Sequence, residues 1–242
     1  MNTEQFVAAL SEISEHNVYK FEQVRASIPL GTDESGGFVV AHREENAARY
    51  FHVCVTGEKG TAYVQKLVLA LACLYEKSEA SFLVLSPREE YGELLRLKNA
   101  DFTVPYVRSV GDLENALATL KEIRQFKTTN AGCPKHFVVL DGLETLPDAE
   151  RSGALTVYRR FIEELGGSGV ELVTCVDLRG SIYAGYPGAF VGIGNCLVTP
   201  KDGGKADVTY VENDSTLSLP REVDCPELEP LKDTVDRFNA LA

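Results

Sequence analysis

The sequence predicts an α/β fold in which a mostly parallel β-sheet carries helices on both faces. Short apolar runs of strand length alternate with longer segments whose apolar residues recur every three to four positions. The apolar runs are nearly continuous, which is typical of strands that are buried on both faces of a sheet. The strands expected in this sheet are residues 51–55, 82–85, 103–107, 137–140, 170–176 and 196–199.

A helix and a β-hairpin are expected before this sheet. Residues 3–15 place Phe6, Val7, Leu10 and Ile13 on one face of a helix. Two apolar runs, at residues 28–31 and 38–41, flank a polar loop with two adjacent glycines, which predicts a hairpin.

Four helices are expected between the strands, at residues 61–76, 88–97, 112–126 and 149–165. The first has an apolar stripe that includes Val64, Leu67, Val68 and Leu71, so it should face the core along one side. Asp112 is the expected N-cap of the third helix.

The C-terminal part is expected to add two weak strands, at residues 207–211 and 216–219, and a last helix after residue 226. We predict one domain over residues 1–242. Residues 1–50 would form its helical and hairpin lead-in, residues 51–200 its core, and residues 201–242 its final strands and helix.

Composition excludes several classes of protein. The net charge of −12 disfavours attraction of the whole surface to nucleic acid, so DNA could bind only through a local surface. The 6 cysteines form no C-x-x-C pair and are expected to be reduced. No basic leader segment is present and no apolar run approaches ~20 residues, so we expect a cytoplasmic protein without membrane insertion.

The stretch from Phe51 to Glu76 contains the main functional signal. It joins a predicted strand to a helix through the loop Gly57-Glu58-Lys59-Gly60-Thr61. A phosphate-binding loop reads G-x-x-x-x-G-K-[ST], and here the lysine and the second glycine are in reverse order. Thr61 still stands where a hydroxyl could bind Mg²⁺, but the same loop is also compatible with a plain β–α turn.

Asp141 is the second candidate, because it ends the most apolar strand and could coordinate Mg²⁺. Many hydrolysing enzymes of this broad class place a glutamate next, to activate water, whereas this chain has Gly142. Glu144 is the nearest carboxylate. A helix cap is an equal alternative for Asp141.

Two segments resemble the FtsK/SpoIIIE family of DNA translocase ATPases. Residues 30–41, LGTDESGGFVVA, resemble the segment that precedes that family's phosphate loop, and residues 64–71, VQKLVLAL, resemble its following helix. In this register Thr61 falls on the family's Ser/Thr, Gly60 on its lysine and Cys54 on its first glycine. Gly142 falls on the family's catalytic acid.

The resemblance implies a RecA-like P-loop NTPase core from a family that forms hexameric rings around DNA. A related branch, the ATPases of type VII secretion, includes degenerate modules that bind partners. The implied ligands are ATP and Mg²⁺, held by Gly57, Glu58, Lys59, Gly60, Thr61 and Asp141, with Thr61 and Asp141 at the metal.

Three functions follow from these observations. The first is a catalytically impaired, FtsK/SpoIIIE-like module that binds or regulates other protein subunits or a related ATPase, within an oligomer or outside one. The second is an active DNA translocase motor in which Lys59 reaches the phosphates through a remodelled loop. The third is a protein-interaction scaffold that binds no nucleotide.

Overall fold

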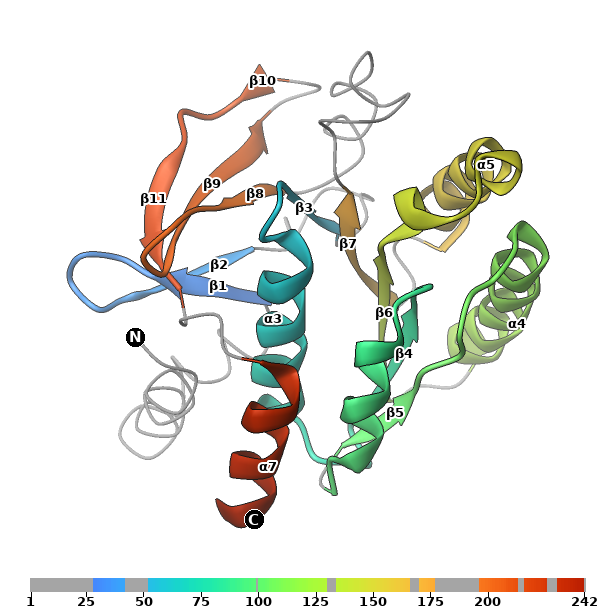
Figure 1. Ribbon diagram of the computed structural model, residues 1–242, viewed down its shortest axis with the longest axis horizontal. Coiled ribbons are helices and arrows are strands. Elements are labelled where there is room, and N and C mark those ends of the chain that lie inside the picture. The colour runs from blue at the N-terminus through green and yellow to red at the C-terminus, as the bar shows by residue number, and fades with distance from the viewer. Residues whose placement is uncertain are drawn as a thin grey trace.

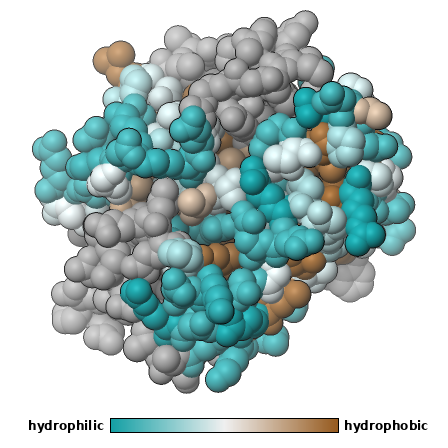
Figure 2. Space-filling view, viewed as in Figure 1, coloured by the Kyte–Doolittle hydropathy of each residue, from teal (hydrophilic) through white to brown (hydrophobic). Residues whose placement is uncertain are grey.

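A computed structural model describes residues 28–41, 52–98, 100–129, 134–165, 170–176, 196–212, 216–225 and 230–241 (Figure 1). The helix predicted at residues 3–15 lies outside these ranges. None of the helices within them combines the length and the apolar content needed to cross a lipid bilayer. The face shown in Figure 2 is mostly hydrophilic over the described residues, and its apolar side chains gather in small separate patches.

One mixed, 11-stranded sheet organises the described residues, in the order β2-β1-β11-β9-β8-β3-β7-β6-β4-β5, with β10 paired to β9. Strands β5, β4, β6, β7, β3 and β8 run parallel to one another, and β9, β11, β1 and β2 extend the sheet in antiparallel pairs. The strands are β1 Ile28–Thr32, β2 Phe38–Ala41, β3 His52–Thr56, β4 Ala80–Leu85, β5 Asp101–Thr103, β6 Lys135–Asp141, β7 Val170–Val176, β8 Cys196–Pro200, β9 Lys205–Glu212, β10 Thr216–Leu217 and β11 Arg221–Asp224.

Helices cover both faces of this sheet. The longer helices are α3 Gly60–Leu74, α4 Val110–Thr129, α5 Asp148–Leu165 and α7 Leu231–Leu241, and the two 3₁₀ helices are η1 Glu89–Arg96 and η2 Leu143–Thr145. Helices α3 and α7 and the 3₁₀ helix η1 share one apolar core, whereas α4 and α5 share a second core on the other face (Figure 1). The predicted α/β class, with a parallel core and helices on both faces, is confirmed.

Helix α3 is buried more completely than its apolar stripe predicted. Most of its residues are buried, including Gln65 and Lys66. The sheet covers one side of the helix and α7 lies near the other, where Lys66 Nζ donates a hydrogen bond to Thr234 Oγ1 at 2.8 Å. A polar side chain can be buried when it finds such a partner.

The structure corrects several local predictions. Helix α4 begins at Val110, so Asp112 lies within its first turn and is not the N-cap. Ser109 caps the helix: its backbone N–H donates to Asp112 Oδ2 at 2.9 Å, and Asp112 N–H donates back to Ser109 Oγ at 3.4 Å. This reciprocal pair is a capping box. The segment predicted as an α-helix at residues 88–97 is the 3₁₀ helix η1, and β5 lies earlier than the predicted residues 103–107.

The predicted hairpin is present, and a carboxylate shapes its loop. Asp33 Oδ1 accepts hydrogen bonds from the N–H groups of Ser35 at 3.0 Å and Gly37 at 2.9 Å. Arg221, on the unpredicted strand β11, donates to Asp33 Oδ2 at 2.7 Å. Asp33 therefore closes the loop and attaches the hairpin to the antiparallel half of the sheet.

A buried histidine links the sheet to α5. Thr174 Oγ1 lies 2.7 Å from His52 Nε2 and accepts a hydrogen bond from the Tyr158 hydroxyl at 2.9 Å. His52 has no exposed surface, and its burial lowers the pKa of the imidazole to about 3. The native state therefore holds His52 neutral, whereas the unfolded chain protonates it near its ordinary pKa of about 6.5.

We predict that His52 makes the protein acid-sensitive. Between pH 6.5 and about 3 the unfolded state binds a proton that the native state does not. The free energy of unfolding should therefore decrease as the pH is lowered, by up to ~1.4 kcal/mol per pH unit. Denaturant unfolding over this range should show the additional slope in the wild type and not in His52→Asn. The carboxylates titrate in both proteins and contribute equally to both slopes, so any difference comes from His52. Equal pH slopes of the unfolding free energy in the two proteins would contradict the prediction.

Candidate functional site

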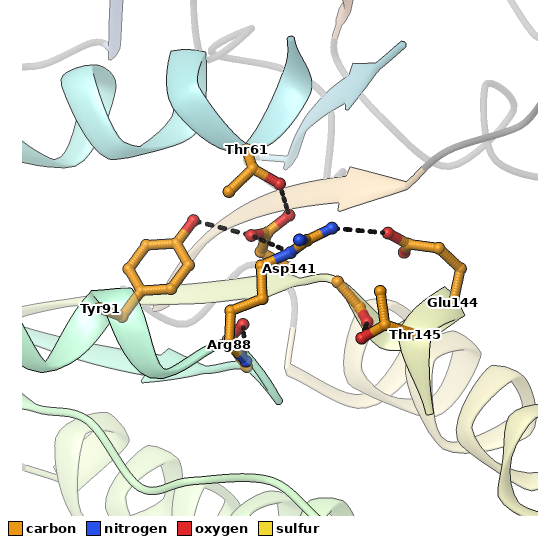
Figure 3. Close-up of polar contacts among 8 residues, drawn as sticks. Thr61, Arg88, Tyr91, Asp141, Glu144 and Thr145 are labelled. Carbon is orange, nitrogen blue, oxygen red and sulfur yellow. Dashed lines mark hydrogen bonds and ion pairs between the residues drawn. The ribbon is translucent and has the colours of Figure 1, made fainter. Parts of the chain in front are cut away.

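The candidate site lies where the parallel strands end. Asp141 is the last residue of β6, Arg88 follows β4, and Thr61 is the second residue of α3, which follows β3. Because the carboxyl ends of parallel strands meet at one edge of a sheet, these side chains come together there (Figure 3). Ligands of open α/β folds bind at this edge.

The Asp141 carboxylate is the centre of this cluster and has no exposed surface. Thr61 donates its hydroxyl to Oδ1 at 3.1 Å, and Tyr91, from η1, donates its hydroxyl to Oδ2 at 3.0 Å. The Arg88 Nε lies 3.6 Å from Oδ2, and the Cys175 thiol of β7 also hydrogen-bonds the carboxyl group. Both carboxylate oxygens are thus engaged by the chain's own side chains (Figure 3).

Burial sets the electrostatics of this cluster. It raises the pKa of Asp141, against the hydrogen bond from Cys175 and the charge of Arg88, which lower it. Burial, followed by the nearby Asp141 charge, raises the pKa of Tyr91 and of Cys175 well above their ordinary values. Tyr91 and Cys175 therefore stay protonated at neutral pH and serve as hydrogen-bond donors to Asp141.

Residues 57–59 form a tight connection between β3 and α3. The Gly60 N–H donates to the Gly57 carbonyl at 2.9 Å, which closes a turn of four residues. Cys54, which the resemblance aligned with the first glycine of the phosphate loop, is buried in the middle of β3. The chain between β3 and α3 is therefore too short to wrap around a phosphate, because a phosphate loop needs several N–H groups facing a common point.

The lysine of this loop points elsewhere. Lys59 Nζ forms an ion pair with Asp202, in the turn between β8 and β9. Glu58 is exposed in the same connection. Of the residues predicted to hold ATP and Mg²⁺, the structure brings Thr61 and Asp141 into direct contact, and it places Lys59 in an ion pair with a different partner.

Gly60 is required by the packing at the start of α3. A Cβ atom at this position would lie 2.5 Å from Cys175 Sγ and 3.6 Å from Val55 Cγ1. A lysine here, as the phosphate-loop pattern demands, would therefore overlap the buried thiol.

Gly142 is required for two reasons. Its φ of 74° is left-handed, a conformation that strongly favours glycine. A Cβ atom there would also lie 2.7 Å from Arg88 Nε. Glu144, the nearest following carboxylate, is bound by Arg88, whose terminal nitrogen lies 3.3 Å from its Oε1.

The implied ligands, Mg²⁺ and ATP, do not fit these residues in this conformation. The permanent positive charge of Arg88 beside Asp141 repels a metal ion, and both oxygens of Asp141 already accept hydrogen bonds that a metal would have to displace. Within the described ranges, no group of three or more His, Cys, Asp or Glu side chains is arranged to hold a metal ion.

Sequence reasoning missed three members of the cluster, namely Arg88, Tyr91 and Cys175. Arg88 was within reach of prediction, because it follows a predicted strand and so belongs to the same sheet edge as Asp141. Tyr91 and Cys175 were not, because one lies in a 3₁₀ helix and the other inside a strand of apolar neighbours.

No protein-family model and no curated protein sequence matches this chain. Among solved structures, the cytoplasmic domain of the type VII secretion ATPase EccC of Thermomonospora curvata is similar, with a TM-score of 0.63 and 14% identity. The match covers 89% of this chain and 31% of that cytoplasmic domain, so this chain spans less than a third of its length. The chain has the fold of these ATPases.

Two further structures support this assignment. ATPases 2 and 3 of EssC from Geobacillus thermodenitrificans match with a TM-score of 0.56 and 12% identity, over 89% of this chain and 49% of EssC. The conjugation coupling protein TcpA, solved with ATPγS, matches with a TM-score of 0.60 and 12% identity, over 90% of this chain and 70% of TcpA. The predicted FtsK/SpoIIIE-like, RecA-like core is thus confirmed at the level of the fold.

We predict that Gly60 and Cys175 are energetically coupled. Gly60→Ala should lower the free energy of unfolding by ~1–3 kcal/mol through overpacking. Adding Cys175→Ala should relieve the overpacking, so denaturant unfolding of the double-mutant cycle should give a coupling of ~1 kcal/mol or more.

Gly92→Ala is the matched control, because a Cβ atom at Gly92 meets nothing within 4 Å. It should not couple to Cys175→Ala. Additive effects of Gly60→Ala and Cys175→Ala would show that the close approach at Gly60 is not under strain.

Proposed function

We propose that this chain is an ATPase-fold module that does not hydrolyse ATP and acts by binding a protein partner. One observation carries the proposal: both oxygens of Asp141 are held by Thr61, Tyr91 and Arg88. A carboxylate engaged in this way is not available to position a metal ion for phosphoryl transfer.

The positions of the missing catalytic groups support the same proposal. Phosphoryl transfer depends on positioned positive charge and a positioned water, and losing one such group can cost several orders of magnitude in rate. Gly60 and Gly142 supply neither a lysine nor a glutamate, and a Cβ atom at either position would lie within 3 Å of a neighbouring side chain, that of Cys175 or Arg88. The lack of ATP hydrolysis would therefore follow from the side-chain packing at this edge of the sheet.

A second candidate is nucleotide binding without turnover, favoured by the contact between Thr61 and Asp141. In that case Lys59 would leave Asp202 and turn toward the phosphates. Asp202 is almost fully exposed and Lys59 is partly exposed, so this ion pair should contribute little stability and be easily broken. The turn closed by Gly60 N–H and Gly57 would also have to open.

The partner we propose is another protein subunit, such as a related ATPase module, in the cytoplasm. Some of the structures that share this fold, such as those of EccC and EssC, belong to longer chains. EccC was also solved in complex with a signal sequence peptide, at 13% identity to this chain. The net charge of −12 argues against DNA as the main partner. We further propose that residues 1–242 act as one domain.

We predict no ATP turnover above background by the purified chain with Mg²⁺, and no change on Thr61→Ala. Gly142→Glu should not create activity, because its side chain would meet Arg88. Phosphate release and calorimetric titration with Mg·ATP are the measurements. Turnover that Thr61→Ala abolishes would overturn the proposal.

The same titration distinguishes nucleotide binding without turnover from a module that binds no nucleotide. Saturable Mg·ATP binding that is weakened by both Lys59→Ala and Thr61→Ala, without turnover, would establish nucleotide binding by this loop. Absence of binding at millimolar nucleotide would exclude it and leave the partner-binding scaffold.

A further inference from the structure

Arg88 lies between the two carboxylates of the site. Its Nε is 3.6 Å from Asp141 Oδ2 and its terminal nitrogen is 3.3 Å from Glu144 Oε1. The Asp141 side chain is fully buried, and those of Arg88 and Glu144 are 31% and 19% exposed. One guanidinium thus bridges the end of β6 and the 3₁₀ helix η2 (Figure 3).

We propose that Arg88 is a built-in replacement for a divalent cation. Its guanidinium neutralises and cross-links Asp141 and Glu144, so that this edge of the sheet keeps one arrangement without metal or nucleotide. The inference rests on the proposed function as a module that does not hydrolyse ATP, and it names the residue that makes the module independent of those ligands.

The chemistry of the group supports this role. Mg²⁺ is held in proteins by one or two carboxylates together with waters, and Asp141 and Glu144 provide two carboxylates. A guanidinium presents several N–H donors in a planar fork and keeps its charge when it is partly buried. The two carboxylates raise the pKa of Arg88 against its burial, so this cation is permanent.

Gly142 provides the space for the arginine. The Arg88 side chain crosses the face of Gly142, where a Cβ atom would lie 3.2 Å from both Cγ and Cδ. A Cβ atom at this position would also lie 2.7 Å from Arg88 Nε, so the arginine side chain would have to shift. The glycine that stands in place of a catalytic acid is therefore the one that accommodates the internal cation.

Removing the charge of Arg88 should convert the cluster into a metal site. In Arg88→Gln, Asp141 and Glu144 lose their shared counter-charge. The Thr61 and Tyr91 hydroxyls are uncharged donors that a divalent cation can displace from Asp141, and the Thr61 oxygen beside Asp141 is then a further ligand. We expect Mn²⁺, followed by electron paramagnetic resonance, to bind this variant at least ~10-fold more tightly than it binds the wild type. Mn²⁺ should also raise the melting temperature of the variant by roughly 2–4 °C or more, and leave that of the wild type unchanged.

Three variants serve as controls. Arg159→Gln removes one exposed positive charge on α5 and should leave Mn²⁺ affinity at the wild-type value. Arg88→Lys keeps a cation and should gain little affinity. Asp141→Asn in the Arg88→Gln background should abolish the gain.

Equal Mn²⁺ affinity of wild type and Arg88→Gln would overturn the inference, as would a gain that persists with Asp141→Asn. If Arg88→Gln is unfolded without metal, recovery of its circular dichroism on adding Mn²⁺ supports the inference, and no recovery at millimolar Mn²⁺ overturns it. These outcomes are independent of ATP turnover by the wild type, which alone decides the proposed function.

Discussion

The buried carboxylate of Asp141 is the interaction on which this end of the fold depends. A charged or polar group without contact with water must be hydrogen-bonded or paired, or it destabilises the native state. Asp141 meets this requirement with one partner from each of its neighbours: Thr61 on α3, Tyr91 on η1, Arg88 after β4 and Cys175 on β7. A single side chain therefore fixes the relative positions of four elements at the carboxyl ends of the strands.

The two unusual glycines follow from that arrangement. Drawing α3 close enough for Thr61 to reach Asp141 places the start of the helix against Cys175, and only Gly60 fits there. Placing Arg88 beside Asp141 requires its side chain to cross residue 142, and only glycine leaves that path open. The glycines at positions 60 and 142 are thus linked through one packed cluster, so introducing a lysine or a glutamate at either position alone would disturb the packing that holds Asp141.

The parts of this structure that sequence predicts are those set by local periodicity. The apolar runs and stripes locate the parallel strands and α3, and the rule that such strands end at one edge places Thr61 near Asp141. Arg88 follows a predicted strand, so the same rule also places it at this edge, whereas Tyr91 escapes the rule because its reach to Asp141 depends on how η1 packs. Strand β11 escapes it too, since its short polar sequence becomes a strand only by pairing with β9 and β1. Whether such a segment forms a strand depends on the strands beside it in the folded protein.

The loop after β3 cannot keep its present contacts and also bind a phosphate. Its Gly60 N–H is used within the turn, its lysine pairs with Asp202, and Thr56 Oγ1 lies 3.2 Å from Thr199 Oγ1 on β8. These contacts join the parallel half of the sheet to the turn that begins its antiparallel half. A phosphate cradle would need the same N–H groups and the same lysine directed at a ligand. Binding a phosphate would therefore require this junction to be taken apart, whereas a module that presents a fixed surface to a partner gains from keeping it closed.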